Sequence, residues 1–576
     1  MKQIYRVISI VVSAALSFAA FCACRGNDGE SSGDVAKNVD QTKSQLTVAN
    51  AYGGLGDQWL RAVIAQFEDF YKDEVFEDGK KGVQVQVENK LVNDMSGQTM
   101  LAKVQGAKEA IWIGEGVYYY DFANSGYCAD ITELVSTPLT EFGENKSIVD
   151  KLDDYLTDEL KTDDGKYYLM PFYEGFYQTY YDADLFDENM IYFKDGASAD
   201  GQDVFDEEFD YESLFISSPN DKKSAGPDKE YGTIDDGLPV SYADFFAMSR
   251  YLYYSCGIVP MVWTGAYITY LIRYCVSLWA NQEGYKNASA YLQLAGELDD
   301  LINVDASGNV TSADSVTLNE SNGYYFQKQK SKYDVLKFVK NLVSHSFIYD
   351  SMSYSSSLSH LGAQDRFLYS KTLSNVQTIA TLTEGSWWYN EATSTFNAME
   401  ADSGDRYGRQ NRRIGVLPPL HATASDNDGS SVLFSLNDSY CFINDSVTGV
   451  TRELAEKFFR FLHTDKALST FTKVTGMTRA FEYKIEGSEF DEMMFYAKSM
   501  YSLKKNSKVI YPVSKNSKVI NNPNYFDPAV IHFTTQISGD TYSNPFRVFK
   551  DNPGITPESY FNGLYTYAHM KWGSLK

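Results

Sequence analysis

LTVANAY (residues 46–52), VQVQV (83–87) and AIWI (110–113) are three strand-like segments, each apolar or alternating in the way β-strands are. Apolar residues recur at helical spacing after the first strand, at Leu60, Val63, Ile64, Phe67 and Phe70, and a second helix is predicted through residues 100–104. This alternation of strand and helix predicts an α/β lobe with a largely parallel sheet.

In parallel sheets, ligands bind beyond the carboxyl ends of the strands. The loops that follow the three strands, at residues 52–57, at Asn93 and at residues 114–120, are therefore candidate parts of a binding site.

The rest of the chain contains a second α/β unit. An acidic stretch rich in Ser, Gly and Asp at 193–236 reads as an insertion or a long surface loop. After it, YADFFAMSRYLYY (242–254) is predicted as a helix, GIVPMVW (257–263) as a strand and YITYLIRYCVSLWA (267–280) as a helix. KNSKVI occurs at 505–510 and again at 515–520, which indicates a hairpin or a local duplication.

The N-terminus has the pattern of a secretory signal: Lys2 and Arg6, then an apolar run from residue 7 to residue 23. A membrane-spanning helix is the weaker interpretation, because it needs about 20 apolar residues and this run is shorter and interrupted by serines. The segment 1–23 is expected to be removed.

The end of this segment, FCACRGNDGESSGD (21–34), resembles the lipobox of bacterial lipoproteins, in which a small residue precedes a cysteine that is lipidated. Ala23 favours Cys24 as that cysteine, although Phe21 and Cys22 fit the upstream positions poorly. Residues 24–45 then read as a flexible tether. Ordinary secretion with cleavage nearby is the alternative.

Composition excludes one class of partner. The 576 residues contain 51 Lys and Arg against 77 Asp and Glu, a net charge of −26, and loss of Lys2 and Arg6 with the signal takes this to −28. Such a surface repels phosphate backbones, so no nucleic acid is expected to bind. The length predicts two lobes or domains, and the aromatic content of 15% suits a recognition surface.

Motifs for catalysis, metals and cofactors are weak. GESSG (29–33) matches the nucleophile elbow but lies in the tether, and TDDGKYY (162–168) lacks the spaced carboxylates of a calcium loop. The six histidines are scattered, no nucleotide-binding loop is present, and Cys128, Cys256, Cys275 and Cys441 read as free buried thiols. No metal and no cofactor are predicted, while a carboxylate pair for glycoside hydrolysis stays open.

Six segments in order carry a resemblance: ANSGYCADITELV (123–135), TDDGKYYLMPF (162–172), TYYDADLFDE (179–188), EGSWWYNEA (384–392), RRIGVLPPL (412–420) and TRELAEKFFRFLHTDKALSTF (451–471). From about residue 46 onward the chain resembles the extracellular solute-binding proteins of carbohydrate ABC transporters, the branch related to maltose-binding protein.

The resemblance implies an α/β, two-lobe periplasmic-binding-protein-like fold of type II, with hinge-linked lobes that close over a sugar. The first lobe would comprise residues 46–172 and 436–495, and the second 173–435 and 496–576. It implies a monomer without enzymatic activity, with a carbohydrate ligand and ABC permease subunits as partners, held by the lipid anchor on the extracellular face of the cell membrane.

The resemblance also implies site residues. A Gly-x-Trp motif of the family places its tryptophan against a sugar ring, and Gly385-Ser386-Trp387 occupies that position. Trp388 either extends the platform or turns into the lobe. The further candidates, each with an ordinary structural alternative, are Trp263, Glu115, Glu174, Tyr173 and Tyr52. Two other functions remain open, a surface glycan hydrolase and an adhesion protein that meets no transporter.

Overall fold

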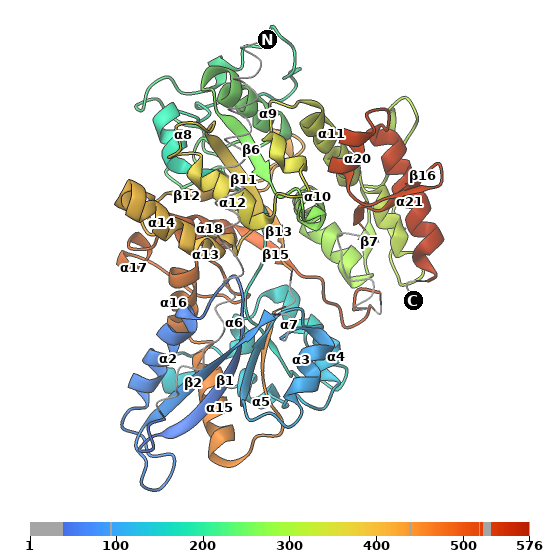
Figure 1. Cartoon of the computed structure of the whole chain (residues 1–576). Coiled ribbons are helices and arrows are strands. Elements are labelled where there is room, and N and C mark those ends of the chain that lie inside the picture. Colours follow the sequence, from blue (N-terminus) through green and yellow to red (C-terminus); the bar gives the residue numbers. More distant parts are fainter. Residues whose placement is uncertain (1–38, 93–94, 437–438, 518, 522–531, 575–576) are drawn as a thin grey trace.

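The computed structural model describes residues 39–92, 95–436, 439–517, 519–521 and 532–574, so Cys24 and Asn93 lie outside the described residues. Figure 1 shows two lobes, each built around a sheet flanked by helices, with a group of C-terminal helices beside the upper lobe.

The first lobe contains a five-stranded sheet with the order β2-β1-β3-β14-β4. Its strands are β1 (Ser44–Tyr52), β2 (Val83–Leu91), β3 (Ile111–Gly114), β4 (Met170–Pro171) and β14 (Tyr440–Ile443). The first three are parallel, as the sequence predicts, and β14 runs antiparallel to both β3 and β4. The carboxyl ends of β1 and β3 therefore meet at one edge, which faces the second lobe (Figure 1).

Helices cover this sheet because their apolar stripes match its faces. In α2 (Gln58–Phe70) the buried residues include Leu60, Val63, Ile64 and Phe67, whereas Phe70 is half exposed and ends the stripe. The other helices of the lobe are α3 (Gly97–Val104), α4 (Tyr119–Ala123), α5 (Thr132–Ser136), α6 (Ile148–Lys151), α7 (Asp154–Glu159), α15 (Gly449–Phe461) and α16 (Asp465–Thr475).

The second lobe contains a four-stranded sheet with the order β12-β5-β11-β6. Its strands are β5 (Tyr177–Asp182), β6 (Val259–Trp263), β11 (Ile379–Gly385) and β12 (Ile414–Leu417). The strand β11 runs parallel to β6 and antiparallel to β5, with Gly385 opposite Tyr177. This register brings the segment after β11 to the point where the chain enters the lobe.

The helices around this sheet include two that differ from the predicted spans. The helix α9 (Tyr242–Arg250) continues into a π-helical turn, η4 (Tyr251–Ser255), and α10 (Ile268–Gln293) is broken at Gly284. The remaining helices are α8 (Ala183–Asn189), α11 (Lys330–Ser344), α12 (His360–Tyr369), α13 (Trp388–Glu391), α14 (Thr393–Ser403), α18 (Phe495–Lys505), α20 (Pro545–Asp551) and α21 (Pro557–Trp572).

The acidic stretch at 193–236 lies against the second lobe and is anchored by aromatic residues. Phe193 and Phe215 are buried and form a β-bridge, and their rings lie 4.7 Å apart. It forms no long helix or strand, in agreement with the predicted surface insertion.

The repeated KNSKVI does not form a hairpin within the described residues. Its first copy forms β15 (Ser507–Ile510), which pairs in parallel with β13 (Ser431–Phe434) instead of with the second copy. The segment thus returns the chain to the second lobe.

The chain passes between the two sheets more than once. It leaves the first sheet after β4 and enters the second at β5, and it returns between β13 and β14. After α16, which packs on α2, it crosses again to α18, which packs on β12.

The four cysteines of the described chain form no disulfide. Cys128, Cys256, Cys275 and Cys441 are free thiols, and all but Cys256 are buried.

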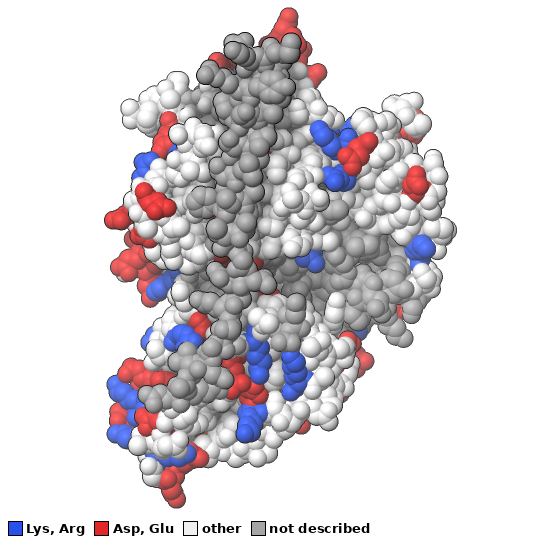
Figure 2. Space-filling view, in the orientation of Figure 1, with Lys and Arg blue, Asp and Glu red and all other residues white. Residues whose placement is uncertain are grey.

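Among the described helices, none combines the length and the apolar character needed to cross a membrane. Figure 2 shows lysines and arginines of the lower lobe interspersed with acidic side chains instead of gathered into a basic surface on that face.

Candidate functional site

Trp387 follows β11, and its indole packs closely over the backbone of two glycines. A Cβ on Gly385 would come within 2.3 Å of the indole, and a Cβ on Gly175 within 3.2 Å. Gly175 belongs to the segment that joins β4 to β5, so the ring rests where the chain passes between the lobes. Its ring is partly buried, which leaves part of its surface for a ligand.

Tyrosines hold the indole edge-on. The rings of Tyr177 and Trp387 lie 5.2 Å apart at 90°, and those of Tyr270 and Trp387 lie 6.4 Å apart at 86°. Arg273, one turn after Tyr270 on α10, donates a hydrogen bond of 2.7 Å to the Tyr177 hydroxyl. This packing fixes the orientation of the indole before any ligand arrives, and a preorganised ring costs less entropy on binding.

A chain of polar side chains lies beside this aromatic group. Gln364 Nε2 donates 2.9 Å to Glu391 Oε2, and His360 Nε2 lies 4.0 Å from the same oxygen. Glu384 is fully buried, and its Oε1 accepts a hydrogen bond from the Gly385 amide. Burial, with a further contribution from Glu391, raises the pKa of Glu384 well above the ordinary value.

Two buried oxygens of this chain lack a donor in the described part of the protein, and the raised pKa of Glu384 favours a protonated carboxyl group that could supply one. Within the described residues, Glu384 Oε2 and Gln364 Oε1 are buried and have no hydrogen-bond partner. A protonated Glu384 can donate to the neighbouring Gln364, which satisfies both oxygens. Glu391, whose pKa is also raised by burial, keeps 17% of its side-chain surface exposed, whereas Glu384 keeps none.

The loop of the first lobe that follows β1 approaches Glu391 of the second lobe. A Cβ on Gly54 would lie 2.8 Å from the Glu391 side chain, and a Cβ on Gly53 would lie 4.0 Å from Glu115 Oε1. Tyr52 is 39% exposed at the end of β1, and Glu115, just after β3, is partly exposed. Tyr52 and Glu115 thus lie at the edge that faces the second lobe, and their contact with a ligand stays a prediction.

Glu174 does not face the cleft, which contradicts its predicted role as an acceptor for ligand hydroxyls. It is fully buried, and its carboxylate accepts from Lys504 Nζ (2.5 Å), Tyr511 (2.5 Å) and Thr478 (2.7 Å). Lys504 also pairs with Asp153 of the first lobe at 2.5 Å. Since internal donors occupy it, Glu174 ties the crossing segment to both lobes instead of binding a ligand.

Trp388 turns into the lobe, so its prediction as a ligand-binding residue is wrong for this conformation. Its side chain has no exposed surface and is packed among aromatic rings. Those rings belong to Tyr180, Phe367, Tyr389, Phe396 and Tyr496. The short helix α13 begins here and points consecutive side chains in different directions, which separates Trp388 from Trp387.

Trp263 is also a core residue, contrary to prediction. It is 1% exposed, and the rings of Tyr349, Tyr354 and Phe546 lie 5.1 to 5.6 Å from its own. The strand β6 ends at this residue, but the segment that carries Tyr349 and Tyr354 and the C-terminal helix α20 cover the strand end. The C-terminal helices therefore close a strand end that the sequence left as a candidate site.

Tyr173 is nearly buried but lies close to Trp387. It is 8% exposed, its ring lies 5.6 Å from that of Phe172, and it also borders Gly175 beneath the Trp387 ring. A hinge-packing role fits this position, and a ligand contact stays a prediction.

Sequence reasoning missed the residues that surround Trp387. Tyr177, Tyr270, Arg273, His360 and Gln364 come from β5, α10 and α12, which are far apart in the chain. A signal for part of the set did exist, because Tyr270 and Arg273 are three residues apart and share one face of a predicted helix.

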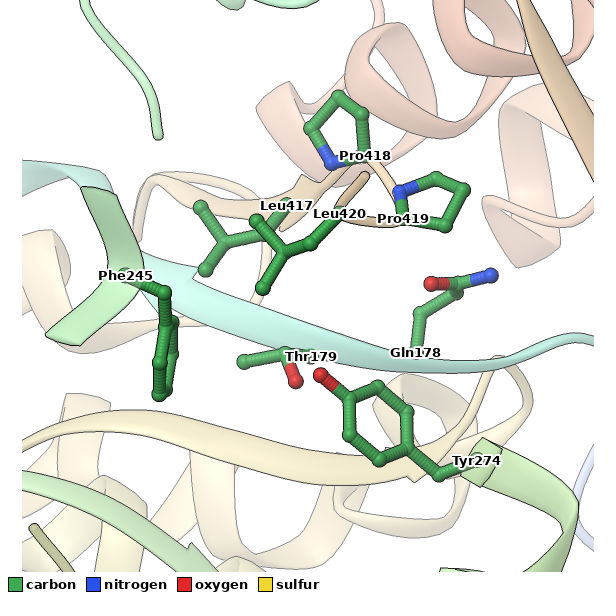
Figure 3. A pocket seen from close by; sticks show the side chains of 8 residues that line it. All are labelled: Gln178, Thr179, Phe245, Tyr274, Leu417, Pro418, Pro419 and Leu420. Carbon is green, nitrogen blue, oxygen red and sulfur yellow. The ribbon is translucent and has the colours of Figure 1, made fainter. Parts of the chain in front are cut away.

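No group of three or more His, Cys, Asp or Glu side chains suited to a metal ion occurs in the described ranges. The recess in Figure 3, between β5 and residues 417–420, is lined by the polar side chains of Gln178, Thr179 and Tyr274 as well as by apolar ones, and is too narrow to admit a water molecule.

Solved structures share this fold. The maltose-bound MalE3 of T. maritima aligns over 92% of this chain and 99% of its own, with a TM-score of 0.50 and 12% identity. The apo form of RafE from Streptococcus pneumoniae aligns over 92% and 99%, with a TM-score of 0.52 and 13% identity. A chitin oligosaccharide binding protein aligns over 92% and 100%, with a TM-score of 0.50 and 11% identity.

These likenesses confirm the predicted fold class. The chain has the mixed α/β, two-sheet architecture of type II periplasmic-binding-protein structures. No family model matches the sequence, and no curated protein matches it either.

Proposed function

We propose that this protein is an extracellular solute-binding protein, without enzymatic activity, that captures a carbohydrate between its lobes and delivers it to an ABC transporter permease. One observation carries the proposal: the indole of Trp387 packs over Gly175 and Gly385 at the boundary of the lobes and stays partly exposed. A sugar presents C–H groups that lie flat on such a ring, while its hydroxyls need polar partners at the edge.

The surroundings of Trp387 supply those partners. Glu391 is the proposed carboxyl acceptor; His360 Nε2 lies 4.0 Å from its Oε2 atom, and the Tyr270 ring lies 6.1 Å from that of His360. The fold supports the same function, because the MalE3 structure holds maltose and a second RafE structure holds raffinose.

Glycan hydrolysis fits this site less well. A glycosidase needs two carboxyl groups that reach opposite sides of a glycosidic bond. Of the two carboxyl groups nearest the aromatic group, Glu384 is fully buried and Gln364 joins it to Glu391. One of the two is therefore withheld from any substrate.

Anchoring through Cys24 is part of the proposal. A diacylated Cys24 would hold the protein at the outer face of the cytoplasmic membrane, because two acyl chains anchor stably where one does not. Residues 24–45 would act as the tether between that anchor and the first lobe.

Ligand-driven closure tests the function. A thermal-shift screen of oligosaccharides selects a ligand, and small-angle scattering is then recorded with and without it at saturation. We expect a smaller radius of gyration with the sugar and no release of reducing ends. An unchanged radius would argue for a rigid adhesion module, and released reducing ends would argue for a hydrolase.

A further inference from the structure

The helix α13 of the second lobe, which follows Trp387, contacts the first lobe at two places. Asn390 Nδ2 donates a hydrogen bond of 2.8 Å to the carbonyl oxygen of Thr475, the last residue of α16. The next side chain of α13, Glu391, lies against the backbone of Gly54, where a Cβ would come within 2.8 Å of it. Both partners belong to the first lobe, because α16 packs on α2 and Gly54 follows β1. Figure 1 shows α16 below α13, at the boundary between the lobes.

Arg409 joins this contact from the segment that precedes β12 in the second lobe. Its Nη2 atom donates to Asn390 Oδ1 at 2.7 Å and to the Val474 carbonyl of α16 at 3.1 Å. Its Nε atom donates to the Tyr389 carbonyl at 3.3 Å. These three acceptors are all uncharged. A cation at the carboxyl end of a helix interacts favourably with the helix dipole, so the end of α16 balances part of the guanidinium charge.

A glycine allows α16 to end this close to the second lobe. Gly476 follows α16 with a φ of +75°, and a Cβ there would lie 2.4 Å from the Tyr496 ring of α18. The Tyr496 ring in turn stacks on the Tyr389 ring of α13, with centroids 4.2 Å apart and an angle of 4°. Side chains from three segments of the second lobe therefore cover the carboxyl end of a first-lobe helix.

These contacts form without the sugar platform. The indole of Trp387 packs on Gly175, Gly385, Tyr177 and Tyr270, all outside the contact with α16. A contact between the lobes that needs no ligand can stabilise the closed arrangement before a ligand arrives.

We propose that Asn390, Arg409 and Glu391, with their first-lobe partners, form a contact that stabilises the closed arrangement of the lobes in the absence of sugar. We refer to this set as the α13 contact. It places Asn390 and Arg409 as positioning residues, which act on the ligand through the arrangement of the lobes. Only its effect on sugar affinity rests on the proposed function.

The α13 contact should set how much of the free protein is ready to bind. A ligand that binds the closed form has its apparent affinity reduced by the fraction of protein that is closed. A hydrogen bond from a charged group is strong enough to change an equilibrium constant about tenfold. Loss of the Arg409 hydrogen bonds should therefore favour the open form and weaken sugar binding by up to about tenfold.

The test is small-angle scattering of the ligand-free wild type and of Arg409→Met, each recorded well below its melting temperature. We expect a larger radius of gyration for the variant, and the sugar selected by thermal shift should bring both proteins to the same smaller radius. Arg406→Met is the matched control, because Arg406 is exposed and its side chain bonds to Tyr407 of its own lobe. This control removes the same charge from the same segment and should leave the radius and the affinity unchanged.

A second pair of variants opens the α13 contact from the first lobe. Gly54→Leu places a side chain against Glu391, and the fold should tolerate it because Gly54 is half-buried and its φ lies outside the left-handed region. Its ligand-free radius should rise as in Arg409→Met. Gly554→Leu adds the same side chain where no atom lies within 4 Å of the new Cβ, and should leave the radius unchanged. If Arg409→Met fails to fold, Gly54→Leu decides alone.

The ligand-free radii keep this proposal separate from the proposed function. Wild-type radii in both Arg409→Met and Gly54→Leu would overturn the α13 contact, even if a sugar binds and closes the wild type. Larger radii in these two variants, with no carbohydrate ligand found in the screen, would uphold the contact and reject the proposed function.

Discussion

Trp387 and Trp388 are adjacent in sequence, yet Trp387 is partly exposed and Trp388 is fully buried, so the same substitution at each position should separate binding from folding. In Trp387→Ala the ring that rests on Gly175 and Gly385 is lost from a partly exposed position. Aromatic stacking on a flat ligand contributes roughly 1–3 kcal/mol, by analogy with nucleic-acid bases. Because ~1.4 kcal/mol is a factor of ten in affinity, this variant should bind its sugar about one to two orders of magnitude more weakly.

Trp388→Ala should behave in the opposite way. Five aromatic residues surround the fully buried indole, and they cannot collapse into the space it leaves without moving β5, α12 and α18. Truncation of a core tryptophan costs about 3–5 kcal/mol of stability. We expect a large drop in Tm for Trp388→Ala and only a small one for Trp387→Ala.

The assay pairs calorimetric titration of the sugar selected by thermal shift with a melting curve of each variant in the absence of sugar. Circular dichroism on both variants controls for misfolding. Unchanged affinity together with a large loss of stability in Trp387→Ala would refute the reasoning, because it would make both tryptophans packing residues.

Three other changes give distinct expected outcomes. Cys24→Ser should move the protein from the membrane fraction to the medium, and retention in the membrane would place the anchor elsewhere. Lys504→Met leaves the carboxylates of Asp153 and Glu174 without their cation and should cost about 3–5 kcal/mol in urea unfolding at a pH where both stay charged. Burial and Asp153 raise the pKa of Glu174 to about 7 even with Lys504 present, and loss of that cation raises it further. Protonation of Glu174 in the variant should therefore shrink the deficit as the pH falls toward 7, and a pH-independent deficit would contradict the pairing. Glu384→Gln removes a buried carboxyl group whose pKa is raised in the folded protein. The stabilising contribution of such a group is complete below its unfolded-state pKa and is lost as the pH rises through its folded-state pKa. The variant should melt like the wild type at pH 5 but lack the fall in Tm of the wild type at alkaline pH, and a matching fall in both proteins would place the titration elsewhere.

Much of the fold was predictable because it rests on local patterns. The apolar positions of LTVANAY and of the helix after it match β1 and α2, and the alternation that follows matches β2 and β3. The hairpin alternative for KNSKVI was wrong, because β15 finds its partner in β13, more than 70 residues earlier, where a buried parallel pairing contributes more than a local turn. Periodicity identifies a strand but carries no information about its partner.

The sequence by itself determined the α/β character, the two-lobed fold, the unfavourable charge for nucleic acid, and EGSWW as the segment that merits attention. Only the tertiary structure decided which tryptophan of that segment stays partly exposed. The strand register sets Gly385 opposite Tyr177 and leaves one indole over two glycines and the next inside the lobe. It likewise decided that Glu174 and Trp263 are internal, since their partners come from segments hundreds of residues later. Exposure is a property of the assembled chain, and a residue's chemistry becomes a site only where packing leaves it accessible.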